Sequence, residues 1–400
     1  MVIANSPGIA HSGRPDGITL ENFQFGPHNR WAFSHIRQII PTTNIPHDRE
    51  RILPLDRRAN AGENQIIDWR GNRLTLDEIA ADHYLDGMLV LKGNEILIER
   101  YWGELRPDRP HLMMSVTKSV VGLLAGKLAN AGLLDLSKPV SAYVPELAES
   151  GWGPDSLQLL LDMRDGADYT EDYDDMTSTV RLQDCAVGWT DADYCPANGP
   201  VGGYHFYPTI GRNEENLGKF VYKSGSTDVV GWVLEAVTGQ PLAALISEHI
   251  WKPMGAEFDA NITVDRSGFV LGDGGMNATL RDLGRFGLLT LNDGVAFGEQ
   301  VIPAAFIKDI ETHPGDPDWP YDAGPGEQPY YRSFWWGRGN GEGDIRGLGI
   351  HGQYLQVAPE AGIVVVFFAS WPTADPYGDG DAYGWTALYG LSAALIEQVR

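Results

Sequence analysis

A serine and a lysine three residues apart open a predicted helix that is otherwise apolar. Ser115 and Lys118 stand at the start of a helix expected over residues 114–131. Positions i and i+3 share one face of a helix, so the Lys118 amine should lie beside the Ser115 hydroxyl. A lysine with a lowered pKa can activate a serine nucleophile, and the free N–H groups of a helix start suit an oxyanion. An unpaired lysine would be costly in so apolar a helix, which favours a functional role.

Other catalytic arrangements are missing from the sequence. It contains neither G-x-S-x-G nor H-E-x-x-H, and its ten histidines are scattered, so no Ser-His-Asp triad or metal site is predicted. The glycine-rich segment 337–343 lacks the strand-then-helix context of a phosphate loop and is expected to be a turn. Asp379 and Asp381 lack the distal glutamate of a calcium loop, so segment 375–384 is expected to be a solvated loop. No metal and no cofactor are predicted.

The spacing of apolar residues along the chain alternates between strand-like and helix-like patterns, and these patterns predict the elements that position the serine. Residues 88–101 read as two strands around a turn at Gly93-Asn94, and residues 352–371 return to strand with the β-branched run 363–366. A Thr279/Asp282 pair resembles a capping box and marks one helix start. Further helices are predicted from apolar spacing: 228–238, 241–251, 279–291 and 385–399.

Strands early and late with helices between them predict an α+β fold. One economical packing is an antiparallel sheet built from both ends of the chain and flanked by terminal helices, with a helical lobe beside it. We expect a single unit of two intermingled lobes, one of about 1–130 plus 265–400 and a mainly helical one of about 131–264. The cleft between such lobes is the natural place for a site.

Charge and cysteine content narrow the choice of partners and location. The net charge of -24 and the pI of about 4.7 disfavour nucleic acid and anionic membranes as partners. Cys185 and Cys195 are too few for a disulfide framework and predict two buried thiols in a reducing compartment. Residues 1–17 lack a signal-peptide pattern, and no apolar stretch reaches membrane-spanning length. We therefore expect a cytoplasmic protein that acts on a small molecule, with a homodimer allowed.

The sequence resembles a known superfamily. The run Ser-Val-Thr-Lys at 115–118 is similar to the first motif of class C β-lactamases, penicillin-binding proteins and related esterases. A much closer resemblance, over nearly the whole chain, is to the branch of 6-aminohexanoate-dimer (nylon-oligomer) hydrolases. It is carried by segments in the same order: 27–33, 112–119, 143–147, 168–173 and 349–353. The resemblance implies a β-lactamase/transpeptidase-like fold.

The resemblance also implies catalytic roles. Ser115 would be the acylated nucleophile and Lys118 its base. Tyr222, in Val-Tyr-Lys-Ser, would match the phenol that passes a proton to the leaving nitrogen and later takes one from water. The backbone N–H groups of Ser115 and Ile350 would form the oxyanion hole. Read without the family, Tyr222 is an aromatic residue before a helix.

Other positions are implied in substrate binding. Tyr173 matches a loop tyrosine that closes over the amide, Asp184 a carboxylate that holds the terminal ammonium, and Trp336 a pocket wall. Asp273 lies where relatives carry Asn or His. Its carboxylate could tighten amine binding or raise neighbouring pKa values, and the sequence leaves both open.

One departure from the superfamily bears on the substrate. The third β-lactamase motif, K-T-G, binds the β-lactam carboxylate, whereas residues 347–349 here are Gly-Leu-Gly without a cation. The resemblance thus implies a serine hydrolase of linear amides, such as 6-aminohexanoate oligomers, and of short acyl esters. Two alternatives remain: a carboxylesterase with negligible amidase activity, and a non-catalytic binding protein of the same fold.

Overall fold

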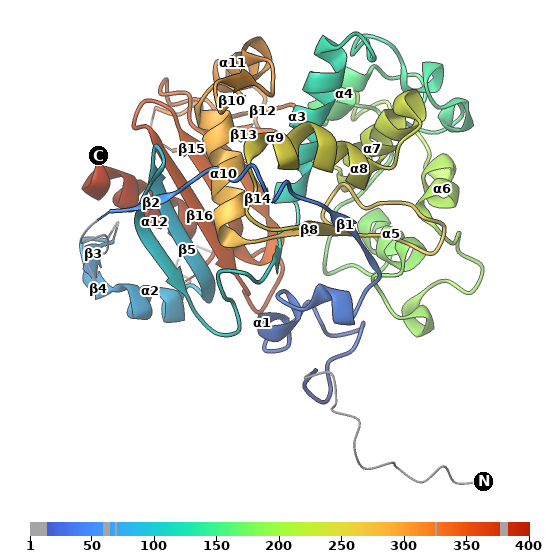
Figure 1. Ribbon diagram of the computed structural model, residues 1–400. Coiled ribbons are helices and arrows are strands. Elements are labelled where there is room, and N and C mark those ends of the chain that lie inside the picture. Colours follow the sequence, from blue (N-terminus) through green and yellow to red (C-terminus); the bar gives the residue numbers. More distant parts are fainter. Residues whose placement is uncertain (1–13, 59–64, 69, 325, 377–382) are drawn as a thin grey trace, which may run out of the picture.

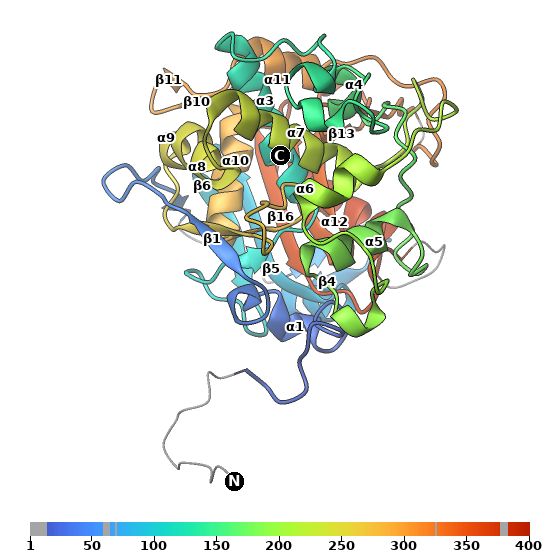
Figure 2. The same ribbon diagram turned by 90° about the vertical axis from the view of Figure 1, so that its right-hand side faces the viewer.

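A broad sheet and a group of helices lie side by side in the computed structural model (Figure 1). The structure describes residues 14–58, 65–68, 70–324, 326–376 and 383–400. The acids Asp379 and Asp381 of the predicted solvated loop lie outside these residues. In the view of Figure 2 the helical part faces the reader, with the sheet behind it.

The main sheet draws its strands from both ends of the chain, as predicted. Its order is β12-β13-β14-β15-β16-β5-β6-β2, and all neighbours are antiparallel except the parallel pair of β2 and β6. The bounds in that order are Tyr330–Arg332, Trp335–Gly337, Ile345–Gly349, Gln353–Ala358, Ile363–Ala369, Leu85–Lys92, Glu95–Tyr101 and Asp56–Arg57. The predicted hairpin is β5–β6, and the glycine-rich segment 337–343 falls in the turn between β13 and β14.

The central strand β16 shows why both faces of the sheet must be covered. Val364, Val366 and Phe368 belong to a core cluster shared with α10 (Leu280–Leu291), whereas Val365 and Phe367 belong to a second cluster with α12 (Trp385–Val399). Side chains alternate across a strand, so a continuous β-branched run buries both faces. The terminal helices α2 (Leu76–Asp82) and α12 cover only the second face. The α+β prediction is confirmed, with α10 as an additional layer.

The predicted cap of α10 is present, and its Asp282 also connects the helix to another segment of the chain. Thr279 Oγ1 accepts a hydrogen bond from the Asp282 N–H at 3.2 Å, which satisfies a free donor of the first turn. The Asp282 carboxylate accepts further hydrogen bonds from the amides of Glu257 and Phe258 and pairs with Arg285. This buried carboxylate therefore ties the helix start to a distant loop.

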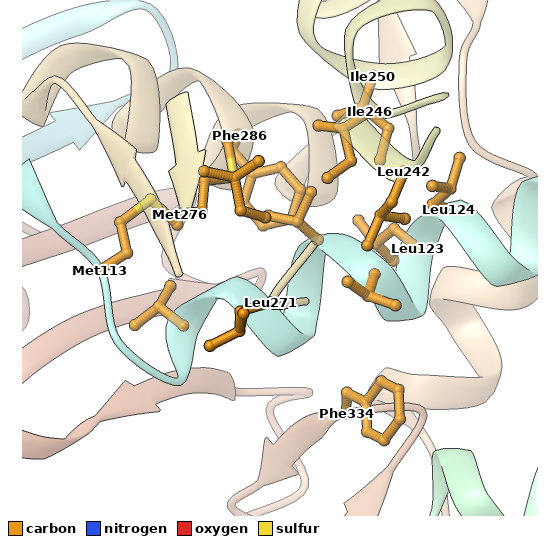
Figure 3. Packing of buried hydrophobic residues seen from close by; sticks show 14 of the residues in the cluster. Met113, Leu123, Leu124, Leu242, Ile246, Ile250, Leu271, Met276, Phe286 and Phe334 are labelled. Carbon is orange, nitrogen blue, oxygen red and sulfur yellow. The ribbon is translucent and has the colours of Figure 1, made fainter. Parts of the chain in front are cut away.

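The serine-bearing helix α3 (Val116–Asn130) is buried almost all round. Figure 3 shows Leu242 and Ile246 on one side of it and Phe334 on the other. A helix with apolar contacts on every side needs small residues where neighbours come closest. At Gly122 a Cβ would lie 2.2 Å from the Ser333 carbonyl oxygen, and at Gly126 it would lie 2.4 Å from the Phe306 ring.

The helical part packs against α3, and α8 (Leu242–Ile246) also contacts a smaller antiparallel sheet. That sheet has the order β1-β8-β9-β7, with bounds Thr42–Ile45, Ala260–Thr263, Met276–Ala278 and His111–Leu112. The helices are α4 Leu157–Leu161, α5 Thr179–Val187, α6 Gly203–Phe206, α7 Ser224–Thr238, α8 Leu242–Ile246 and α9 Lys252–Met254. The helix predicted over 241–251 is divided, because α8 continues as a π-helical stretch, Ser247–Trp251. The lobe boundaries proposed above stay a prediction.

Smaller elements complete the chain. They are α1 Asn29–Ala32, α11 Ala304–Glu311, and the hairpins β3–β4 (Gln65–Ile67, Arg73–Thr75) and β10–β11 (Val295–Ala296, Glu299–Gln300). Among the helices described, none is by itself long and apolar enough to cross a membrane. The bent pair Ser224–Thr238 and Leu242–Met254 meets that test only when its two members are taken together.

The prediction of two free buried thiols is wrong. Cys185 and Cys195 form a disulfide, with their Cα atoms 5.5 Å apart, and both are only partly buried. The chain reverses at Gly188, which ends α5 with a left-handed φ of 81°, and this reversal brings the two cysteines together. A spacing of ten residues contains no sign of that reversal. The inference of a reducing compartment therefore loses its basis in the cysteines.

The close approach at Gly122 gives a stability prediction. We expect Gly122→Ala to lower the free energy of unfolding by about 1–3 kcal/mol, because the new methyl would overlap a backbone carbonyl that cannot rotate away. Urea unfolding measures the difference. The matched control is Gly211→Ala, where a Cβ meets nothing within 4 Å and φ is not left-handed. Equal stability changes in the two variants would contradict the packing described for α3.

Candidate active site

A strained turn presents Ser115 at the start of α3. Met113 at the end of β7 donates its N–H to the Met276 carbonyl at 2.8 Å, and Met114 then adopts a left-handed φ of 45°. This conformation is uncommon for a residue with a long side chain and persists only where the surroundings hold it. Ser115 follows as the N-cap of the helix, and its side chain makes no capping bond. The hydroxyl is thus left for other partners.

Lys118 lies beside Ser115, as the i, i+3 spacing predicts, and it is removed from water. Its side-chain Nζ donates at 2.7 Å to Ser115 Oγ and at 2.6 Å to the main-chain carbonyl of Asp273. The residue is 1% exposed. Burial lowers the pKa of Lys118, and the carboxyl groups of Asp273, Glu171 and Asp228 act against that shift without cancelling it.

Tyr222 reaches the same hydroxyl from the segment before α7. The Ser115 side chain lies close enough to Tyr222 to influence the pKa of its phenol, and Lys118 Nζ lies 5.3 Å from the centre of the phenol ring. The ring stacks on Trp336 at 5.4 Å between centroids, which fixes its plane. Burial, with Tyr331 and Glu171 nearby, raises the pKa of Tyr222, so the phenol keeps its proton. The next residue, Lys223, turns away and pairs with the buried Asp165 at 3.4 Å.

The end of β14 lies directly against the serine. A Cβ on Gly349 would stand 2.6 Å from the Met113 carbonyl oxygen and 2.9 Å from the Ser115 nitrogen, and one on Gly347 would stand 3.1 Å from Ser119 Oγ. Glycine at position 349 is therefore required for the strand to approach α3, and a side chain at position 347 would crowd Ser119. Ile350, the next residue, lines the same pocket as Ser115. The two expected oxyanion-hole residues, Ser115 and Ile350, thus line the same pocket.

Polar and apolar side chains together line the pocket beside Ser115. It brings together the predicted residues Ser115, Tyr173, Asp184, Asp273 and Ile350, whereas Trp336 reaches the site through its contact with Tyr222. Its remaining lining residues are Gln24, Met114, Val180, Arg181, Gln183, Trp189, Ser224, Leu271 and Gly274.

Asp273 belongs to a buried pair of carboxyl groups. The Asp273 N–H donates to Asp228 Oδ1 at 2.9 Å. Gln183 Nε2 donates to Asp273 Oδ2 at 2.8 Å. Tyr207 donates its hydroxyl to the second oxygen of Asp228. Burial raises the pKa of both acids, and the proximity of Asp273 raises that of Asp228 further. Of the two effects left open for Asp273, the structure shows the rise of neighbouring pKa values.

Glu171 connects the loop tyrosine to the start of α7. Tyr173 donates its hydroxyl to Glu171 Oε1 at 2.6 Å, and the Ser224 amide donates to Oε2 at 2.6 Å. Ser224 Oγ donates to the same carboxylate. Burial raises the pKa of Glu171, and Lys118 opposes the rise. Tyr173 is thereby held over the pocket by a carboxylate on its own loop.

Asp184 meets a cation of its own helix. Arg181 Nη1 lies 2.9 Å from Asp184 Oδ2, one turn apart on α5. Burial, together with the nearby Asp273 and Glu171, raises the pKa of Asp184 to about 7, although Arg181 acts in the opposite direction. The acid predicted to hold a substrate ammonium is thus already paired inside the protein.

Several residues in or next to the pocket were missed from the sequence. Asp228 is an acid in the first turns of the otherwise apolar α7, where an unpaired carboxylate would be costly, and this was an available signal. Arg181 stands three residues before Asp184, a spacing that also indicates a shared helix face. Trp189 lies beyond the reversal at Gly188, and no sequence pattern reveals its place in the pocket.

Comparisons with known proteins agree with this geometry. The model of the family described as Beta-lactamase matches residues 75–389. The 6-aminohexanoate-dimer hydrolase of Paenarthrobacter ureafaciens is 37% identical over 402 aligned residues, which cover 99% of this chain and 96% of the relative. A solved structure from Bacillus anthracis, provisionally described as a 6-aminohexanoate-dimer hydrolase, has a TM-score of 0.83 at 26% identity, with 96% of each chain covered. The hydrolase EstCE1, at 15% identity and TM-score 0.58 over 80% of this chain and 96% of that one, shares the fold.

The match to the family model covers most of the chain and includes Ser115, Lys118 and Tyr222. The chain belongs to the beta-lactamase family, as a serine hydrolase, and within it to the branch of the 6-aminohexanoate-dimer hydrolases. The resemblance stated from the sequence motifs is confirmed.

The position of Ser115 gives a labelling prediction. We expect Ser115→Ala to abolish labelling by a fluorophosphonate probe and hydrolysis of any substrate, because it removes the hydroxyl that lies 2.7 Å from the Lys118 amine. Intact-protein mass spectrometry measures the label. Ser119→Ala is the control: Ser119 lies on the same helix and bonds the Phe334 carbonyl, so its loss should cost about 1 kcal/mol of stability and leave labelling intact. Labelling of the Ser115→Ala protein would disprove the assignment.

Proposed function

We propose that this hydrolase cleaves linear amides of the 6-aminohexanoate-oligomer type, and short acyl esters, through an acyl-enzyme on Ser115. The observation that supports this most is the contact of the Lys118 amine with Ser115 Oγ at 2.7 Å, inside a lysine environment whose burial lowers the pKa. A neutral lysine amine is a base strong enough to activate a serine hydroxyl.

In the first step Lys118 takes the proton of Ser115 as Oγ attacks the substrate carbonyl carbon. The negative charge that develops on the carbonyl oxygen would be met by the amides of Ser115 and Ile350, at the approach of β14 to the start of α3. The positive end of the α3 dipole, at the N-terminus of the helix, also stabilises this negative charge. The substrate carbonyl thus needs no metal in this proposal.

In the second step the bond to the leaving nitrogen breaks. Tyr222 passes its phenolic proton to that nitrogen, and the ammonium of Lys118 can return a proton to Tyr222. Water then attacks the acyl-enzyme and gives its proton to Lys118, or to Tyr222 where that group is still a phenolate. The same proton passes to Ser115 Oγ as the bond between the acyl carbon and the serine oxygen breaks. The raised pKa of Tyr222 supports this role, because the phenol is protonated when the amine must leave.

The carboxyl groups of the pocket support an amine-bearing substrate. Asp184 is proposed to hold the substrate's terminal ammonium, with Asp273 nearby, and Tyr173 to close over the amide. An ammonium would favour the charged form of Asp184, whose pKa of about 7 leaves it only partly ionised near neutrality. Residues 347–349, at the position of the K-T-G motif of β-lactamases, contain no cation for a β-lactam carboxylate.

The pairing of Arg181 with Asp184 favours one alternative, a carboxylesterase with negligible amidase activity, because it reduces the attraction for a free ammonium. The two functions separate when a p-nitrophenyl acyl ester and the 6-aminohexanoate dimer are assayed side by side. Turnover of both substrates supports the amidase function, whereas cleavage of the ester alone supports the carboxylesterase alternative. Absence of both probe labelling and turnover would favour a binding protein.

The leaving-group role predicts unequal losses for Tyr222→Phe. Amide cleavage should fall by about 10²–10⁴-fold, since an amine must be protonated to leave, whereas cleavage of a p-nitrophenyl ester should fall much less. The measurement is kcat/KM for both substrates. Tyr331→Phe, which removes a hydroxyl from the ring packed edge-on against Tyr222, is the matched control and should keep the ratio of the two rates. Equal losses on amide and ester would remove Tyr222 from this role.

A further inference from the structure

Arg181 and Asp184 make one end of the pocket dipolar. Both side chains line the pocket that contains Ser115, and they are only 11% and 13% exposed. The guanidinium and carboxylate meet at 2.9 Å, one turn apart on α5. A ligand that enters the pocket therefore meets a positive and a negative group side by side, not a carboxylate alone.

Two hydrogen-bond donors at this end have no acceptor. Within the described part of the chain, Arg181 Nε and Trp189 Nε1 are buried and without a hydrogen-bond partner. Both residues line the pocket. A buried donor without an acceptor costs free energy, and the cost on a charged group is larger. An acceptor supplied by the substrate would remove it.

A bare ammonium does not fit this end well. It would contact Asp184, yet it would also approach the Arg181 guanidinium and leave both N–H groups unpaired. The head group of an α-amino acid carries an ammonium and a carboxylate on one carbon. Its ammonium can face Asp184 while its carboxylate faces Arg181 and Trp189, so that the four charges alternate in sign. Carboxylates are the group to which a guanidinium binds with charge-assisted hydrogen bonds.

We propose that the acyl side of the pocket selects linear chains that end in an α-amino acid group. The substrates are then ω-amides of α-amino dicarboxylic acids, which water cleaves to the free dicarboxylic acid and an amine. Arg181 is the residue that sets this preference. The inference rests on the proposed amidase function, because it names the substrate class of the same pocket.

The test compares three p-nitroanilides of equal chain length. The first is the 6-aminohexanoyl anilide, the second carries an added carboxylate on the carbon that bears the amine, and the third is the N-acetylated form of the first. We expect the wild-type protein to cleave the second with kcat/KM about tenfold above the first, as one charge-assisted contact allows, and the third least well. A wild-type preference for the first anilide over the second would overturn the proposal.

Variants assign the preference to Arg181. Arg181→Gln should reverse the order, so that the anilide with ammonium alone becomes the better substrate, and Arg181→Lys should keep part of the original preference. Arg266→Gln removes the same charge from an exposed position outside the pocket and should keep the wild-type ratio. Thermal melts check the fold of each variant. An unchanged ratio in a folded Arg181→Gln protein would contradict the proposal.

A second measurement separates this proposal from the amidase function. The product acids, 2-aminoheptanedioate and 6-aminohexanoate, are added while a fluorophosphonate labels Ser115. Stronger protection by 2-aminoheptanedioate supports the dipolar pocket even if no anilide is cleaved, in which case only the amidase proposal fails. Stronger protection by 6-aminohexanoate would contradict the inference and leave the amidase proposal standing.

Discussion

The rest of the site depends on a lysine amine held out of water at the start of α3. Lys118 is almost fully buried and donates hydrogen bonds to Ser115 Oγ and to the Asp273 carbonyl. Burial of a cationic group disfavours its charged form, and this is how an amine becomes a base near neutrality. The apolar helix, the approach of β14 at Gly349 and the segment 272–275 are the elements that exclude water from it.

The acids around Lys118 oppose the lowering of its pKa, but burial limits their own ionisation. Asp273, Glu171 and Asp228 would each favour the ammonium form of Lys118, but burial raises the pKa of all three. Each acid also accepts hydrogen bonds from the protein: Gln183 donates to Asp273, Tyr207 to Asp228, and Ser224 to Glu171. These neutral donors hold the carboxyl groups without adding positive charge. Because burial favours the neutral forms of these acids, they offset the lowered pKa of Lys118 only in part.

Local patterns were enough to predict much of the fold. The helices over 279–291 and 385–399 and the hairpin around Gly93-Asn94 carry their own caps, periodicity and turn residues, and they occur within a residue or a few of the predicted bounds. The Ser115–Lys118 contact followed from helical spacing alone. The resemblance to the family then extended the prediction to Tyr222 and Ile350, which no local pattern singles out.

Features that depend on chain reversals and tertiary contacts could not be predicted in this way. The disulfide needs the turn at Gly188, and the pocket position of Trp189 needs the same turn. The smaller sheet joins strands from residues 42–45, 111–112, 260–263 and 276–278, each too short to show an alternating pattern. The division after Ile246 comes from a change of helical pitch without a proline or glycine at that point.

The most direct test of the account is the pH dependence of Ser115 acylation in a single turnover. Stopped-flow release of p-nitrophenol from p-nitrophenyl acetate measures the acylation rate before the acyl-enzyme breaks down. Because Lys118 must be neutral to take the Ser115 proton, the rate should rise with pH through an apparent pKa clearly below the ordinary lysine value of 10.5, and Lys118→Ala should lose that rise. A rate that increases only as an ordinary lysine loses its proton, or the same profile without Lys118, would contradict the account.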